Sequence, residues 1–553
     1  MGSPIDGLRQ FAESVHPRTF IRLREAGAIG DPKGLLGFAG ALPWLIGRGQ
    51  SLGIVSQMHS IVLGDKPAIL DRNGEESWKD LDMRANQFAR ALRQKGIRGS
   101  ERVAILLRNG REMIEVALGA QKMGIVACPL NTWAKPKELK NTLESADPSL
   151  LVYDTKHAEQ VEACAHEGID LVFVGDKDKA LEGSISYEDL IRDQSASPPP
   201  PFTKDRGSAK VVIHTSGTTG TPKGAERNSS GAGLGALANL LGRVPYRRDD
   251  VIFCPAPLFH SFGLATFTFA CALGSTMILP EKFDPEESLK LIEEHQATAA
   301  SFIPVMIKRI VKLPDEVKKK YDLSSLRIVM ASGSAMSPEL RKAALDLFGD
   351  VLYDLYGSTE IGWVTIATPE DMKSKPKTVG RPVDGIDVAI FSDNGERLET
   401  GDTGELFVKS NMLFEGYTSG ESRDERDGYM SIGDLGHQDE DGHIFIEGRA
   451  DDMVVVGGEN VYPIEIEELI ESLDGVDEAA VLGVQDDEYG EVLAAFVVGS
   501  VSKDQVVESC KKDLASYKVP RRVEVLDELP RTSTGKVLKR DLIDSLKGAD
   551  PLE

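Results

Sequence analysis

The chain has 553 residues, of which 41% are hydrophobic and 27% are charged, a composition typical of soluble globular proteins. Its length exceeds what a single hydrophobic core usually organises, which predicts two or more domains. The formal net charge of −24 argues against nucleic acid or an anionic membrane as a general partner. The five cysteines show no metal-like spacing, so we expect reduced, mostly buried thiols in a cytoplasmic protein; they are Cys128, Cys164, Cys254, Cys271 and Cys510.

The first thirty residues are polar and mixed in charge, which argues against a signal peptide. The following apolar segment, Gly34–Gly49, is too short to span a bilayer and contains Pro43. Two interpretations of this segment stay open. It is either a helix pair packed on the domain surface or an interfacial patch that makes weak peripheral contact with a membrane.

Short apolar runs alternate with an amphipathic helical stretch at 112–123, a pattern typical of parallel sheets covered on both faces. The expected strands are Val103–Leu107, Ile125–Cys128, Leu150–Tyr153 and Leu171–Val174. Four prolines, Pro198–Pro201, predict an exposed connector to the next segment.

That next segment is a loop, His214–Gly224, which follows the apolar run Val211–Ile213. It combines three glycines, five hydroxyl side chains and Lys223, the donors and the cation that a polyphosphate needs. It is not a Walker A loop, because Pro222 and Gly224 stand where that pattern needs other residues. Its composition alone also fits a flexible surface turn.

A second α/β region is expected to contain the strands Val251–Cys254, Met277–Leu279, Ala300–Ile303 and Ile328–Met330. After Gly401 short strands and turns dominate, with Gly404–Val408 as a half-buried strand. The last hundred residues predict a compact α+β unit. Its helices are expected at Ile464–Leu473 and Val506–Ala515, and its strands at Ala479–Val484 and Leu493–Val498.

Four further motifs follow the loop in order: Asp354–Glu360, Tyr429–Asp434, Gly448–Met453 and Pro530–Lys536. Together the five motifs resemble those of the adenylate-forming superfamily, which includes acyl-CoA synthetases, nonribosomal peptide adenylation domains and firefly-type luciferases. The resemblance covers about residues 50–545 and implies an α/β fold. A large N-terminal domain (1–450) would hold parallel α/β sheets and a small β-barrel-like subdomain, and a mobile α+β domain (451–553) would follow a hinge at Asp451.

The resemblance implies that the loop residues hold the β- and γ-phosphates of ATP, that Tyr356 stacks on adenine and that Asp354 accepts from its amino group. Thr359 would reach the α-phosphate, Glu360 would bind Mg²⁺, and Asp434 would accept from both ribose hydroxyls. Ile432 departs from the threonine usual before the motif's glycine. The implied ATP-binding residues are Thr215, Ser216, Gly217, Thr218, Thr219, Lys223, Gly333, Ser334, Ala335, Asp354, Leu355, Tyr356, Gly357, Asp434 and Arg449.

The resemblance also implies the catalytic parts. Lys536 would bridge the substrate carboxylate and the α-phosphate, while Gly457 and Gly458 would border the tunnel for coenzyme A. His260, in the aromatic element Pro257–Gly263, would lie beside the substrate carboxylate, although a hydrogen-bonded histidine at a strand end also fits. The catalytic set is Lys536, Glu360, Thr359 and His260, and the acyl pocket is expected to comprise His260, Phe262, Phe302, Val305, Ser358 and Gly362.

Apolar pocket walls favour an aliphatic acid, so the expected activity is that of a medium- or long-chain fatty acyl-CoA synthetase using ATP, Mg²⁺ and coenzyme A. An aryl-CoA ligase is the nearest alternative, and a fatty acyl-AMP ligase is the next. The latter carries an extra insertion in the large domain, and 360–385 shows none. A catalytically silent nucleotide or lipid sensor is the non-enzyme alternative. Small molecules are the expected partners, and a homodimer is allowed.

Overall fold

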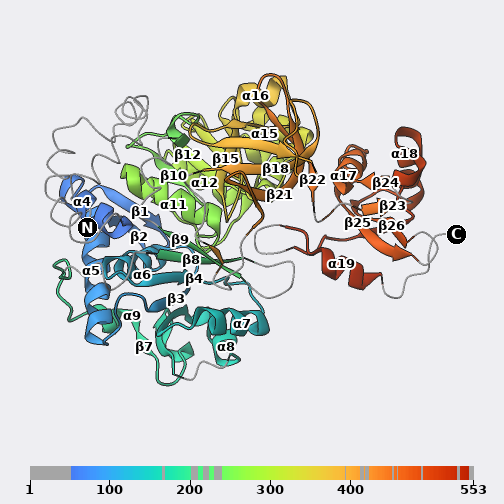
Figure 1. The fold of residues 1–553 in the computed structure, drawn as a ribbon. Helices are drawn as coiled ribbons and strands as arrows, with labels where there is room; N and C mark the ends of the chain where they lie inside the picture. The colour runs from blue at the N-terminus through green and yellow to red at the C-terminus, as the bar shows by residue number, and fades with distance from the viewer. Residues whose placement is uncertain are drawn as a thin grey trace.

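The computed structural model describes residues 51–164, 168–200, 210–215, 223–228, 239–392, 394–410, 416–417, 423–450, 452, 454–456, 459–486, 490–531 and 536–546. A large α/β part carries the N-terminal and central segments, and a smaller unit at the C-terminal end lies against one side of it (Figure 1). Among the described residues, helical turns of 3₁₀ type at Thr155–His157, Lys177–Lys179 and Ser516–Lys518 connect longer elements.

An eight-stranded sheet forms the first layer of the large part, in the order β19-β9-β8-β4-β3-β5-β6-β7. Its strands are β3 (Arg102–Leu106), β4 (Val126–Pro129), β5 (Leu150–Asp154), β6 (Asp170–Val174), β7 (Ile185–Ser186), β8 (Lys210–Thr215), β9 (Lys223–Asn228) and β19 (Gly416–Tyr417). The strands from β8 to β7 run parallel, and all five residues of β5 are buried, which explains its continuous apolar run.

Helices α5 (Trp78–Gln94), α6 (Arg111–Lys122), α7 (Pro136–Ala146), α8 (Ala158–Glu162) and α9 (Tyr187–Ile191) belong to the same layer. The antiparallel pair β8–β9 sets Thr215 opposite Lys223. The two ends of the predicted phosphate loop therefore lie side by side at one end of the sheet.

A second, larger sheet has the order β17-β18-β21-β22-β16-β15-β14-β13-β12-β10-β11-β1-β2, with β20 paired to β21. Its strands are β1 (Pro67–Asp71), β2 (Gly74–Ser77), β10 (Val251–Phe253), β11 (Thr276–Ile278), β12 (Ala299–Phe302), β13 (Ile328–Ser332), β14 (Leu352–Ser358), β15 (Gly362–Ala367), β16 (Thr378–Pro382), β17 (Asp387–Phe391), β18 (Gly404–Lys409), β20 (Glu425–Arg426), β21 (Tyr429–Gln438) and β22 (Ile444–Arg449). From β1 to β14 the neighbouring strands run parallel, and from β14 to β17 they run antiparallel. The strand-rich subdomain expected after residue 401 thus continues the large sheet through β16.

The helices of this layer are α4 (Leu52–Val62), α11 (Ser261–Leu273), α12 (Pro285–Glu294), α13 (Pro304–Val311), α14 (Asp315–Lys318), α15 (Pro338–Phe348) and α16 (Pro369–Ser374). Local signals explain where α15 begins, because the Ser337 hydroxyl accepts from the Leu340 N–H and Pro338 occupies the first turn. Neighbouring parallel strands bring their carboxyl ends to one edge, so the segments after β12, β13 and β14 meet there.

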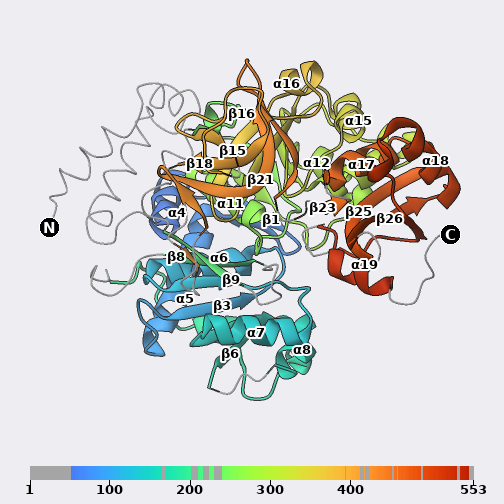
Figure 2. The same cartoon turned by 45° about the vertical axis from the view of Figure 1, so that its right-hand side comes forward.

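The C-terminal unit contains β23 (Val454–Val456), β24 (Glu459–Val461), β25 (Val476–Asp486), β26 (Gly490–Gly499), β27 (Arg522–Leu526), α17 (Pro463–Glu471), α18 (Lys503–Asp513) and α19 (Lys539–Ser545). Strands β25, β26 and β27 form a sheet whose two faces bury separate apolar clusters, neither of which includes residues of the large part. Figure 2 shows α17, α18 and α19 around this sheet. The exact domain boundary at 450/451 stays a prediction.

The expected strands and helices quoted above are all present within a few residues of their predicted bounds. All five cysteines are buried and none forms a disulfide. Within the described part of the chain, no helix has both the length and the apolar character needed to cross a bilayer.

Candidate active site

A cleft of about 1930 Å³ lies between the large part and the C-terminal unit, and both contribute to its walls. The carboxyl end of β14 and the segments after β12 and β13 supply one wall. The C-terminal unit supplies the other, including the segment that ends in Lys536. The predicted residues that line this cleft are His260, Phe262, Val305, Gly333, Ser334, Ala335, Asp354, Leu355, Tyr356, Gly357, Ser358, Thr359, Glu360, Gly362, Asp434, Arg449 and Lys536.

Glu360 is the second residue after β14, and only 7% of its surface is exposed. Its Oε1 lies 3.4 Å from Nη2 of Arg423, a residue that the sequence motifs did not single out. A carboxylate is a suitable ligand for Mg²⁺. In this structure the Arg423 guanidinium offsets the negative charge of Glu360. The cleft therefore contains both the expected metal ligand and a cation that can approach phosphate.

Asp434 on β21 holds two partners. The Tyr356 hydroxyl donates to Oδ2 at 2.5 Å, and Arg449 Nη1 lies 3.1 Å from Oδ1. Burial and the adjacent Asp434 carboxylate raise the pKa of Tyr356 well above its usual value, which keeps the phenol protonated as a donor. The register of β21 and β22 places Asp434 opposite Arg449, so two distant motifs meet here.

Asp354 is buried, and its Oδ2 accepts from Arg341 Nη2 at 2.6 Å. Nη1 of Arg341 also donates to the carbonyl oxygens of Pro376 and Thr378, so the guanidinium is fixed on α15. Burial raises the pKa of Asp354 despite this partner. Arg341 is a second site residue that sequence reasoning missed, since helix α15 shows no motif.

Gly433 explains why the third motif contains glycine. Its φ of +78° lies in the left-handed region. A Cβ there would lie 2.9 Å from Nη1 of Arg423 and 3.3 Å from Nη2 of Arg449. Two guanidinium groups therefore pack over the bare backbone of this residue, which concentrates positive charge at one end of the cleft.

His260 immediately precedes α11. Burial, and to a lesser extent the charge of Lys536, lowers its pKa to about 4, so the ring is neutral near pH 7. Lys536 of the C-terminal unit and His260 of the large part both line this cleft. Two residues 276 positions apart in the chain thus face the same space.

The apolar side chains that line the cleft include Phe259, Phe262, Ala265, Phe269, Val305, Met330 and Trp363. The prediction that Phe302 lines the acyl pocket is wrong. Phe302 is fully buried in the core, where its ring packs against Phe253 and Phe348, and it does not reach the cleft. Val305, in the helix that follows β12, does line the cleft.

Several predicted positions lie outside the described residues: Gly34–Gly49, Ser216, Gly217, Thr218, Thr219, Asp451, Gly457 and Gly458. For Thr215 and Lys223 the structure describes the backbone in β8 and β9 but not the side chains. Their roles stay predictions.

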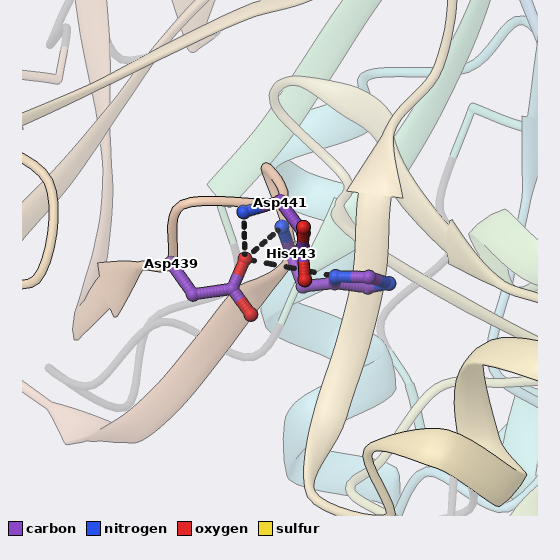
Figure 3. A group of neighbouring side chains, drawn as sticks. All are labelled: Asp439, Asp441 and His443. Carbon is purple, nitrogen blue, oxygen red and sulfur yellow. Dashed lines mark hydrogen bonds and ion pairs between the residues drawn. The ribbon is translucent and has the colours of Figure 1, made fainter.

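One group with metal-ligand spacing occurs among the described residues, on the turn between β21 and β22: Asp439, Asp441 and His443 (Figure 3). The Lys375 ammonium binds both carboxylates, and His443 Nε2 lies 2.9 Å from Asp371 Oδ1. Asp439 Oδ1 also accepts two backbone N–H groups of the same turn. These contacts explain the cluster as a structural turn, so we assign it no metal.

The sequence pattern of the AMP-binding enzymes matches residues 61–418, and that of the AMP-binding enzyme C-terminal domain matches residues 465–536. An indoleacetate–CoA ligase of Aromatoleum aromaticum is 32% identical over 86% of this chain and 94% of its own length. A long-chain-fatty-acid–CoA ligase of Mycobacterium tuberculosis is 31% identical, also over 86% of this chain and 94% of its own length. The structure of an anthranilate CoA ligase in complex with anthranoyl-AMP superimposes with a TM-score of 0.81 at 25% identity, covering 90% of this chain and 97% of that one. The chain therefore belongs to the AMP-binding enzyme family, the adenylate-forming superfamily that its motifs resemble.

Proposed function

We propose that this enzyme is an ATP-dependent acyl-CoA synthetase that acts on medium- or long-chain fatty acids. The observation that supports the proposal most directly is the convergence in one cleft of Lys536 and His260 with Glu360, Asp434 and two guanidinium groups. Cations from both parts of the protein face a space whose other end is apolar. That arrangement suits the reaction of a carboxylic acid that has an apolar chain with a nucleotide.

In the first step a carboxylate oxygen attacks the α-phosphorus of ATP, a P–O bond to the leaving pyrophosphate breaks, and acyl-AMP forms. Both reactants are anions, so neutralising charge is the main task of the protein. Lys536 would lie between the carboxylate and the α-phosphate, while Arg423 and Arg449 would face the phosphates and the ribose. Mg²⁺ held by Glu360 would add further positive charge at the phosphates.

His260 contributes as a neutral group in this proposal. With a pKa near 4 it does not add a second positive charge beside Lys536 at neutral pH. Its ring would border the carboxylate end of the acid and separate it from the apolar end. Little proton transfer is needed, because the carboxylate is already ionised and pyrophosphate leaves without protonation.

In the second step the thiol sulfur of coenzyme A attacks the acyl carbonyl, the thiol proton passes to solvent, and AMP leaves with the electrons of the C–O bond. Lys536 lines the same cleft as His260 in the present arrangement, so a rotation of the C-terminal unit about Asp451 would clear a path for the thiol. Gly457 and Gly458 would border that path.

The choice of acid rests on the apolar lining and on the relatives. The lining of the cleft includes the seven apolar side chains named above, four of them aromatic. The fatty-acid relative from Mycobacterium tuberculosis supports an aliphatic acid. The indoleacetate and anthranilate ligases support an aryl acid as the second candidate, since aromatic walls also stack on a flat ring.

Incubation of the protein with ATP, Mg²⁺ and single acids tests the proposal. AMP release is expected to require both an acid and coenzyme A, with straight-chain acids preferred over aryl acids. Preference for aryl acids would replace the proposed substrate by the second candidate. Adenylate formation without any transfer to coenzyme A would identify a carrier-loading ligase, and no AMP with any acid would identify a silent homologue.

A further inference from the structure

Glu478 lies near the start of strand β25 and contacts both parts of the protein across the cleft. Its Oε1 lies 3.7 Å from Nζ of Lys308 on α13 in the large part. Its Oε2 accepts from Nη2 of Arg531 at 2.8 Å within the C-terminal unit. The Glu478 side chain is 18% exposed, and those of its two cationic partners are 24% and 28% exposed, so all three are largely shielded from solvent.

Arg531 stands at the base of the segment that carries Lys536. A backbone bridge pairs Arg531 with Val537, and the Leu538 N–H donates to the Pro530 carbonyl at 2.7 Å. These contacts close the segment on both sides of Lys536. A carboxylate that holds the Arg531 guanidinium is therefore one backbone bridge away from Val537, the residue next to Lys536.

Hydrogen bonds with a neighbouring helix hold the backbone of strand β25 next to Glu478. Two carboxylates of α17 accept from its outer edge: Glu471 from the Ala479 N–H at 3.2 Å and Glu467 from the Val481 N–H at 2.8 Å. The neighbouring Asp477 pairs with Lys312, the residue that caps the C-terminal end of α13. Glu478 thus combines a fixed backbone, a contact to the large part and a contact to the lysine-bearing segment.

We propose that Glu478 is a positioning residue for adenylate formation, which it supports by aligning Arg531 and docking on Lys308 so that Lys536 faces His260. The inference rests on the proposed function in that it assigns Lys536 to the first step. The proposal assigns Glu478 no contact with the substrate. Its contribution is to the fraction of molecules in which Lys536 is in place.

Replacing Glu478 by glutamine keeps the shape of the side chain and removes its charge. Partly shielded ion pairs of this kind contribute modestly, so we expect adenylate formation to slow by about three- to tenfold. Thioester formation from supplied acyl-AMP and coenzyme A should be unchanged, because that step does not use the contact with Lys308. E478D, which keeps the charge, should recover part of the loss.

The matched control is E508Q, which changes an exposed glutamate of α18 remote from the cleft and should leave both steps unchanged. The double variant E478Q/R531Q should be no slower than the slower single variant, because both remove the same alignment. Amide hydrogen exchange of peptides covering 530–538 should be faster in E478Q than in the wild type and in E508Q.

Exchange that is unchanged in E478Q would overturn the proposal, as would an equal loss in the two half-reactions or fully additive effects in the double variant. Because the exchange measurement does not depend on turnover, it tests the positioning role of Glu478 separately from the proposed function. If the wild-type protein forms no adenylate with any acid, the proposed function fails. Faster exchange around Lys536 in E478Q would then still support the positioning contact.

Discussion

The substitution G433A tests whether the guanidinium pair at the nucleotide end of the cleft binds ATP. Gly433 has φ of +78°, and a Cβ would meet the ends of Arg423 and Arg449 at 2.9 and 3.3 Å. The backbone strain of an alanine in the left-handed region costs about 1–2 kcal/mol. Both guanidinium ends are flexible and can move aside, so we expect the clash to change their position more than the overall stability.

Displacing one guanidinium from phosphate would remove a charged hydrogen bond worth about 1.5 kcal/mol or more. The KM for ATP should therefore rise roughly tenfold in the pyrophosphate-exchange assay. G401A is the matched control, because Gly401 has φ of +94° and its Cβ would meet no described atom within 4 Å. Both variants should unfold at similar, slightly lowered temperatures. An equal KM for ATP in G433A and G401A would refute the reasoning.

Two further predictions concern titration and charge. The folded pKa of His260, about 4, lies below its ordinary value of 6.5, so the unfolded chain binds more protons between these values and stability should fall as pH drops from 6.5 to 4. H260F should flatten that part of a thermal-unfolding pH profile, and an unchanged slope would contradict the buried neutral ring. K375M should lower the unfolding temperature measurably and leave the KM for ATP unchanged, because Lys375 neutralises Asp439 and Asp441 on a turn outside the cleft. A raised KM in K375M would link that turn to the nucleotide site.

Much of the architecture could be predicted because local sequence patterns determine it. The buried strands β5 and β13 appear as continuous apolar runs, and the motifs after β14 and within β21 carry the residues that line the cleft. The family motifs also led to Lys536, although it reaches the cleft from a separate unit. The order of the motifs along the chain was enough to identify these residues.

Contacts between distant, motif-free positions could not be predicted in this way. Arg341 and Lys308 lie on ordinary amphipathic helices, and Glu478 lies on a strand of mixed character. Their significance depends on which carboxylate or guanidinium the fold brings opposite them. Phe302 shows the converse error, since it is close in sequence to pocket residues but lies on β12, a strand that is buried along its whole length.

Formation of acyl-AMP by the K536A variant, measured in a single turnover with ATP, Mg²⁺ and a preferred acid, tests the central claim most directly. If Lys536 neutralises the approaching carboxylate and α-phosphate, adenylate formation should fall by about two orders of magnitude or more, comparable to losing one preorganised charge-stabilising donor. Conversion of supplied acyl-AMP to the thioester should persist. Wild-type rates of acyl-AMP formation in K536A would contradict the account.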